Sequence, residues 1–147
     1  MAPARSPTRP AAPPADALSL SGRHILVVED EVLLAIDMEA ALQAAGAEVV
    51  GPAHGLDAAG RLLATSRFDA AVLDVDLGGE EVFPLADTLL AAGVPLVFTT
   101  GHPEVDLPGR FAPAAHFAKP VDVARVIEAV SRAIRRNPVP AWNPLRS

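Results

Sequence analysis

Short apolar runs alternate with segments of helical periodicity along most of this chain, and this alternation restricts the possible folds more than any other feature. Aliphatic runs that predict buried strands occupy residues 24–29, 48–52, 69–74, 95–99 and 115–118. Apolar residues recur at helical spacing in residues 31–45, 56–66 and 80–92, and again after Asp122. Strands that alternate with helices predict a parallel sheet covered on both faces. We therefore expect an α/β fold with a doubly wound, five-stranded parallel sheet.

The segment between the fourth and fifth predicted strands departs from this alternation. It reads GHPEVDLPGRFAPA, and Pro103, Pro108 and Pro113 leave no interval long enough for a regular helix of several turns. We expect a loop over residues 101–114 with at most one helical turn.

Proline-rich segments at both ends predict one folded domain between two tails. Residues 1–22 contain five prolines and residues 137–147 read NPVPAWNPLRS, so neither segment is expected to fold alone. We expect disordered tails at 1–22 and 137–147 around one domain at 23–136. Trp142 in the second tail either packs back on the domain or engages a partner, and packing back is the favoured interpretation.

Composition excludes several classes of site. The 147 residues include no cysteine, which excludes disulfides and thiolate metal sites and indicates a reducing cytoplasm. A net charge of −6 argues against direct DNA binding, because phosphate backbones select basic surfaces. Since no apolar run approaches the length of a membrane span, we expect no membrane insertion.

Charged and hydroxyl side chains gather after the predicted strands. In an open parallel sheet the carboxyl ends of the strands meet at one edge, where ligands bind. The residues at these ends are Glu29, Asp30, Asp74, Asp76, Thr99, Thr100 and Lys119. Several carboxylates in one pocket repel each other by roughly 4 kcal/mol per close pair in a partly screened medium. A hard divalent cation offsets this repulsion, and carboxylate and carbonyl oxygens select Mg²⁺ or Mn²⁺.

Lys119 is the single lysine of a chain with eleven arginines. Its place after the fifth strand suggests a need for a compact charge on a flexible stem instead of a guanidinium fork. Chance in an arginine-rich composition is the alternative explanation, and the acidic residues at the neighbouring strand ends make it a poor one.

The motifs VVEDE, LDVDLGG, a threonine pair and KP follow the strands in this order and resemble the receiver domains of bacterial two-component response regulators. The resemblance covers residues 23–136. More narrowly, PLVFTTGH resembles the PFxFATGY signature of the FAT GUY class of single-domain receivers, which has a loop where other receivers carry their fourth helix. The resemblance implies a flavodoxin-like sheet of order 2-1-3-4-5. It also implies a stand-alone receiver that signals by binding another protein, because no second domain is expected after residue 136.

The resemblance further implies a role for each acidic residue at the strand ends. Asp74 would accept a phosphoryl group from the phosphohistidine of a sensor histidine kinase or phosphotransfer protein, and would also face the metal. Asp30 would bind Mg²⁺ directly, and Glu29 would bind it through water. The backbone carbonyl of Asp76 would complete the ligands that the protein supplies.

Two further residues would respond to phosphorylation. Lys119 would pair with Asp74 at rest and with a phosphoryl oxygen afterwards. Thr100 would bond another phosphoryl oxygen, and its movement would carry the switch. Loop 101–114 follows Thr100 directly, so we expect it to be the surface that a downstream partner recognises.

The sequence departs from the family pattern at three positions. Thr99 and His102 stand where the signature has Ala and Tyr, so the choice of Thr100 as the sensor depends on its place before Gly101. His116 stands where many receivers have an aromatic switch residue, and a half-buried strand residue explains it equally well.

Two other functions remain open at this point. A phosphorylation-silent pseudo-receiver would use the same fold only to bind partner proteins. Asp74 and Asp76 also match the DxD motif of haloacid-dehalogenase-like phosphohydrolases. That family begins its fold with this motif, however, and has Thr or Val where Gly78 stands here. Under the receiver interpretation the protein is no enzyme beyond its own phosphorylation and dephosphorylation.

Overall fold

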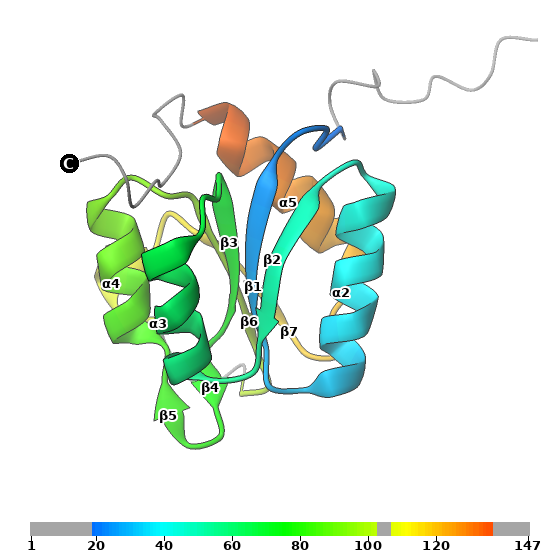
Figure 1. The fold of residues 1–147 in the computed structure, drawn as a ribbon. Coiled ribbons are helices and arrows are strands. Elements are labelled where there is room, and N and C mark those ends of the chain that lie inside the picture. Colours follow the sequence, from blue (N-terminus) through cyan, green and yellow to red (C-terminus); the bar gives the residue numbers. More distant parts are fainter. Residues whose placement is uncertain (1–18, 103–106, 137–147) are drawn as a thin grey trace, which may run out of the picture.

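The computed structural model describes residues 19–102 and 107–136. Its large sheet has five parallel strands, which are β1 (His24–Val28), β2 (Glu48–Ala53), β3 (Ala70–Asp74), β6 (Leu96–Thr100) and β7 (Ala115–Ala118). They lie in the order β2-β1-β3-β6-β7 (Figure 1). Counted within this sheet alone, the order is the predicted 2-1-3-4-5, so the predicted fold class is confirmed.

Helices cover both faces of the sheet, as expected for strands that are apolar on both sides. One face is covered by α2 (Val32–Ala44) and α5 (Val123–Arg136), and the other by α3 (Leu56–Thr65) and α4 (Phe83–Ala91) (Figure 1). Side chains of β1 alternate between the two cores, because successive strand residues point to opposite faces. Leu26 and Val28 belong to the core under α3 and α4, whereas Ile25 and Val27 belong to the core under α2 and α5.

The loop after β6 contains no α-helix in its described part, as predicted from its prolines. Residues 107–114 include one short 3₁₀ helix, η1 (Gly109–Phe111). Phe111 is fully buried, and its ring centroid lies 5.3 Å from that of Phe98 and 5.6 Å from that of Phe83. The neighbouring Arg110 donates to both carboxylate oxygens of Asp87 on α4. The Phe111 ring and the Arg110–Asp87 ion pair thus hold this loop against α4 and β6.

A small hairpin between β3 and α4 was not predicted. Its strands are β4 (Asp76–Leu77) and β5 (Glu80–Glu81), and it projects from the sheet at the end of β3 (Figure 1). Gly78 and Gly79 form the turn with φ angles of 65° and 92°, a conformation that favours glycine at both positions. The helix predicted from residue 80 therefore begins later, at Phe83, because residues 80 and 81 pair with the hairpin.

The folded part begins before residue 23, although residues 1–22 were expected to form a tail. The Leu20 side chain is only 1% exposed in the core beside α2, and its N–H donates to the Ala45 carbonyl at 2.8 Å. The predictions for residues 1–18 and 137–147, including Trp142, lie outside the described residues. Among the helices that the structure describes, none combines the length and apolar character needed to cross a membrane.

Candidate functional site

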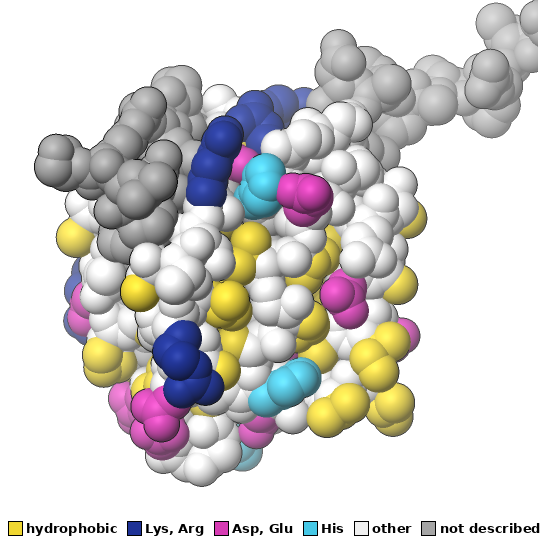
Figure 2. Space-filling view, in the orientation of Figure 1, with side chains coloured by type: hydrophobic (Ala, Val, Ile, Leu, Met, Phe, Trp, Pro, Cys, Tyr) yellow, Lys and Arg dark blue, Asp and Glu magenta, His cyan; other side chains and the backbone are white. Residues whose placement is uncertain are grey.

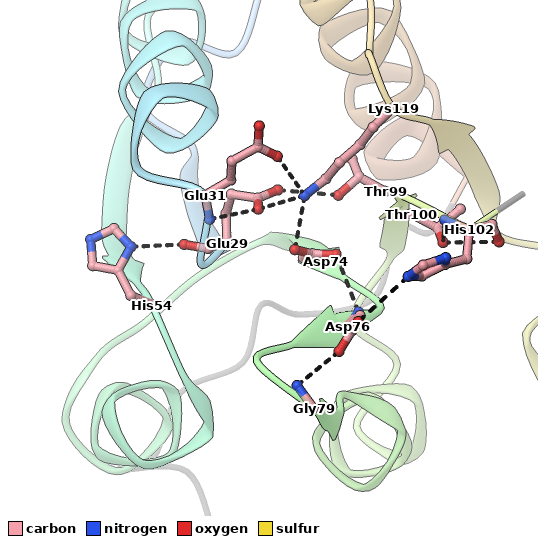
Figure 3. Close-up of polar contacts among 10 residues, drawn as sticks. All are labelled: Glu29, Glu31, His54, Asp74, Asp76, Gly79, Thr99, Thr100, His102 and Lys119. Carbon is pink, nitrogen blue, oxygen red and sulfur yellow. Dashed lines mark hydrogen bonds and ion pairs between the residues drawn. The ribbon is translucent and has the colours of Figure 1, made fainter.

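The register of the sheet brings the predicted strand-end residues to one edge. Asp74 at the end of β3 pairs with Thr99 in β6, and the next residue, Thr100, pairs with Ala118 in β7. Lys119 follows directly, and its backbone N–H donates to the Thr100 carbonyl at 2.7 Å. Parallel strands in register end together, so residues far apart in the sequence meet in one pocket (Figure 3).

The ammonium of Lys119 lies among three carboxylates (Figure 3). Its Nζ is 2.9 Å from Glu29 Oε2, 3.0 Å from Glu31 Oε2 and 3.0 Å from Asp74 Oδ2. Burial by itself would lower the pKa of Lys119, but the hydrogen bonds to Glu29, Glu31 and Asp74 outweigh this effect and hold it above its ordinary value. The lysine is therefore a permanent cation in this pocket.

Asp74 is almost completely buried, with 2% of its surface exposed, and Glu29 beside it is 3% exposed. Burial raises the pKa of Asp74 because it disfavours the charged carboxylate, and the neighbouring Glu29 carboxyl raises it further. Lys119 acts in the opposite direction but does not cancel these effects, so the pKa of Asp74 reaches about 8. One ammonium thus does not compensate the negative charge of this pocket.

A cation bound by three of the carboxylates would supply the missing positive charge. Glu29, Asp30 and Asp74 each offer an oxygen, and these oxygens lie within 4.8 Å of one another. The set consists only of carboxylate oxygens, which suit a hard divalent cation such as Mg²⁺ and not a soft metal. Asp30 is exposed while the other two are buried, so the cluster opens to solvent on one side. The residues present therefore fit the predicted kind of metal.

The side chain of Asp76 has a different place from these three. Its Oδ1 accepts the Gly79 N–H at 3.0 Å and so stabilises the hairpin turn, and its Oδ2 lies 3.8 Å from Nε2 of His102. The backbone N–H of Asp76 donates to Asp74 Oδ1 at 3.2 Å. Asp76 therefore contacts the site through its backbone, while its carboxylate holds the hairpin (Figure 3).

The two threonines at the end of β6 have different partners. Thr99 is completely buried, and its hydroxyl donates to Glu29 Oε1 at 3.4 Å. The Thr100 hydroxyl accepts the N–H of His102 at 3.0 Å, which places it in the turn that begins the loop. Thr99 thus contacts the buried carboxylates, and Thr100 contacts the chain that leaves the site.

Two contacts of the site were not predicted from the sequence. Glu31 is the last residue of the VVEDE motif, but its contact with Lys119 was not foreseen. His54 follows β2, and its Nδ1 lies 2.7 Å from the backbone oxygen of Glu29. The position of His54 just after a predicted strand was the available signal. His116 is exposed on the edge strand β7.

An exposed apolar surface begins directly beside the acidic pocket. Val32, Leu33 and Ile36 lie on the first turns of α2, and their exposed fractions are 57%, 77% and 54%. Figure 2 shows an apolar group at the corner of the molecule where α2 begins. Exposed apolar side chains that cluster in this way are typical of a protein interaction site.

Known proteins that are similar to this chain are regulatory proteins. No family model matches the chain. It is 35% identical over 115 residues to the phyllosphere-induced regulator PhyR of Methylorubrum extorquens, a match that covers 76% of this chain and 43% of PhyR. It is 28% identical over 128 residues to the transcriptional regulatory protein PdtaR of Mycobacterium tuberculosis, covering 84% of this chain and 62% of PdtaR. The chain thus spans less than two thirds of either relative.

Solved structures share the fold. The response regulator PhyR from Brucella abortus matches with a TM-score of 0.70 at 24% identity, over 82% of this chain and 51% of that protein. A CheY-like response regulator receiver domain protein from Methanospirillum hungatei matches with a TM-score of 0.66 at 20% identity, over 79% and 96%. A response regulator from Burkholderia pseudomallei, solved with a phosphorylated aspartic acid, a calcium ion and citrate, matches with a TM-score of 0.61 at 21% identity, over 80% and 73%.

Proposed function

Because this chain belongs to the receiver domains of response regulators, we propose that it accepts a phosphoryl group on Asp74 and signals by phosphorylation-dependent protein binding. One observation carries the proposal. The buried Asp74 carboxylate lies 3.0 Å from the only lysine of the chain and within 4.8 Å of two further carboxylates that fit a divalent cation. The phosphoryl group and the Asp74 carboxylate are both negatively charged and repel each other. Lys119 and a bound divalent cation would supply the positive charge that offsets this repulsion.

In the proposed reaction a carboxylate oxygen of Asp74 attacks the phosphorus of a phosphohistidine. An O–P bond forms, the N–P bond of the donor breaks, and the imidazole leaves with the electron pair of that bond. An aspartate is a weak nucleophile, so the surrounding groups have to offset the charge on the phosphoryl oxygens and hold the attack in line. The ammonium of Lys119 is one such group.

Glu29, Asp30 and Asp74 would hold the cation, Mg²⁺ or Mn²⁺, and the backbone carbonyl of Asp76 is proposed to complete the set. When bound, this ion supplies positive charge to the carboxylates and to the phosphoryl oxygens. The nucleophile is the ionised form of Asp74, whose pKa burial raises to about 8. The residues that hold the ion therefore also control how readily Asp74 loses its proton.

The conformational signal would begin at the hydroxyl of Thr100. This hydroxyl now accepts the His102 N–H, so a bond to a phosphoryl oxygen would compete with the turn after β6. Loop 101–114 continues from that turn and is our proposed switch surface. Hydrogen exchange in Mg²⁺ with and without beryllofluoride, a phosphoryl mimic, tests this step. Unchanged protection across residues 101–114 would contradict it.

The phosphoryl donor would be a sensor histidine kinase or a phosphotransfer protein. The exposed apolar side chains of Val32, Leu33 and Ile36 lie one to five residues after Glu31, which contacts Lys119. A donor that docks on this surface would bring its phosphohistidine next to Asp74. The downstream target would also be a protein, because the net charge of −6 disfavours direct DNA binding. The absence of cysteine agrees with a cytoplasmic location.

Incubation with acetyl phosphate and Mg²⁺, followed by intact-mass analysis, tests the proposal. We expect wild type to gain one phosphoryl group and Asp74→Ala to gain none. Asp76→Asn is the matched control, because it removes the charge of a neighbouring carboxylate and keeps the oxygen that accepts the Gly79 N–H. It should still be phosphorylated.

The same experiment separates the two alternatives. A pseudo-receiver that only binds partners would gain no mass in wild type, and this result would refute phosphoacceptance. A phosphohydrolase would release phosphate steadily from general phosphomonoesters, and wild-type activity of this kind that Asp74→Ala abolishes would favour an enzyme instead.

A further inference from the structure

A groove lies on the far side of the molecule from the acidic pocket. It encloses a cavity of about 530 Å³ between the C-terminal ends of α4 and α5, the starts of β6 and β7, and η1. Figure 1 shows that α4 and α5 end at the edge of the sheet opposite the hairpin. The groove is open there because a loop, not a helix, follows β6. Its volume lies within the range of about 300–1,000 Å³ that is usual for ligand pockets.

The walls of this groove combine apolar side chains with arginines. Leu96 and Phe111 line the groove but are buried, whereas Leu90 presents apolar surface to it and is 41% exposed although it is a large aliphatic residue. Arg132 and Arg136 on α5 line one side. No acidic residue is among the lining residues in the described part of the chain. Apolar surface next to guanidinium groups suits an aromatic ring, since the ring face attracts cations and the ring body excludes water.

The chain itself supplies such a ring close to the groove. Arg136, a lining residue, is the last residue of α5, and residues 137–147 continue directly from it. Trp142 is the only tryptophan of the chain and follows Arg136 by six residues. An extended proline-rich segment of that length reaches roughly 19 Å at about 3.1 Å per residue. Because Arg136 itself lines the groove, this reach is enough to bring the ring to the groove walls.

We propose that residues 137–147 dock in this groove and that Trp142 packs against Leu90 and the α5 arginines. The segment contains three prolines and no acidic residue, so it loses little backbone freedom when it docks and brings no charge that competes for the guanidinium groups. A tethered segment meets its site at an effective concentration on the order of millimolar, so even a weak contact keeps it bound. The docked tail would cover the apolar surface that stays open because a loop, not a helix, follows β6.

Tryptophan fluorescence tests this inference directly in the full chain, because the sequence has one tryptophan and no tyrosine. We expect the emission of Trp142 to lie at shorter wavelength than that of a synthetic peptide of residues 137–147. We also expect weaker quenching by acrylamide than in the peptide. Both properties should persist on dilution. The test does not depend on phosphorylation of Asp74.

Two pairs of variants locate the docking site. Leu90→Ser and Arg136→Gln should shift the emission toward that of the peptide. Leu33→Ser and Arg135→Gln are the matched controls, because Leu33 is an exposed leucine of α2 and Arg135 is the neighbour of Arg136, and neither lines the groove. Their emission should equal that of wild type. Circular dichroism of each variant verifies that it is folded.

Several results would overturn the inference. Wild-type emission equal to that of the peptide would mean that the tail is not docked. Equal shifts in Leu90→Ser and Leu33→Ser would mean that Trp142 packs elsewhere. A blue shift that disappears on dilution would assign the groove to the tail of a second copy. Emission that shifts only when an acidic peptide is added would assign the groove to a separate acidic partner.

Discussion

The raised pKa of Asp74 makes a specific prediction about stability and pH in the absence of metal. Burial and the Glu29 carboxyl raise this pKa from 3.8 to about 8 in the folded protein. Between these two values the folded protein binds a proton that the unfolded chain releases. The group therefore stabilises the fold fully below its unfolded pKa, and this stabilisation is lost as the pH rises through about 8. Metal-free wild type should become less stable from acidic to mildly alkaline pH.

The expected size of this effect makes it measurable. One extra bound proton in the folded state corresponds to a slope on the order of 1 kcal/mol per pH unit. Over two pH units the free energy of unfolding should fall by roughly 2 kcal/mol, a substantial part of the total of about 5–15 kcal/mol that is usual for a domain. Lys119 does not contribute to the slope in this range, because its raised pKa keeps it protonated throughout.

Urea unfolding in EDTA at several pH values between the two pKa values measures the slope. Asp74→Asn cannot ionise, so it should lose most of the slope and should be more stable than wild type at the alkaline end. Asp76→Asn is the control and should keep the wild-type slope, since its carboxylate is exposed in the hairpin. Mg²⁺ should stabilise wild type more at the alkaline end, where it competes with fewer protons. Parallel curves for wild type and Asp74→Asn would refute this account of the pocket.

Three further predictions test other parts of the molecule. Lys119→Met should slow phosphorylation by acetyl phosphate, followed by intact mass, and should destabilise the fold by about 3 kcal/mol at alkaline pH, because it leaves Asp74 buried without its cation. Phe111→Ala should lower the free energy of unfolding in urea by about 3–5 kcal/mol, because it empties a fully buried aromatic position. Ile36→Ser should slow phosphotransfer from a donor protein but not from acetyl phosphate. Its unfolding free energy should change by less than about 0.5 kcal/mol, because the side chain is 54% exposed.

Much of the fold follows from the sequence because the strands are apolar on both sides. The runs that became β1, β3 and β6 are buried along almost their whole length, and such runs leave few alternatives to a central parallel strand. The start of α4 was wrong for a local reason. Residues 80 and 81 directly precede the apolar residues of the predicted helix, so they were included in it. They pair with β4 instead, because Gly78 and Gly79 both adopt positive φ angles and form a hairpin turn.

Side-chain direction was the part of the site that the sequence could not provide. Strand ends determine which backbones meet, and so Glu29, Asp74 and Lys119 could be grouped from the order of the predicted strands alone. Glu31 ends the VVEDE motif that also contains Glu29, but its contact with Lys119 depends on how a long side chain turns back from the start of α2. Thr99 and Thr100 are both threonines, and they have different partners because successive strand residues point to opposite sides of the sheet.

The electrostatics of the pocket explain why such a site can work as a switch. Glu29 and Asp74 are buried and Glu31 and Asp30 are exposed, and a single ammonium contacts Glu29, Glu31 and Asp74 but not Asp30. A pocket with this excess of negative charge costs stability unless a proton or a cation enters it. Its free energy is therefore sensitive to any change of charge at Asp74. Phosphorylation is such a change, and Lys119 is anchored through its backbone to Thr100 at the start of the loop. We therefore propose that a change of charge at Asp74 is transmitted through Lys119 to Thr100 and the loop that follows it.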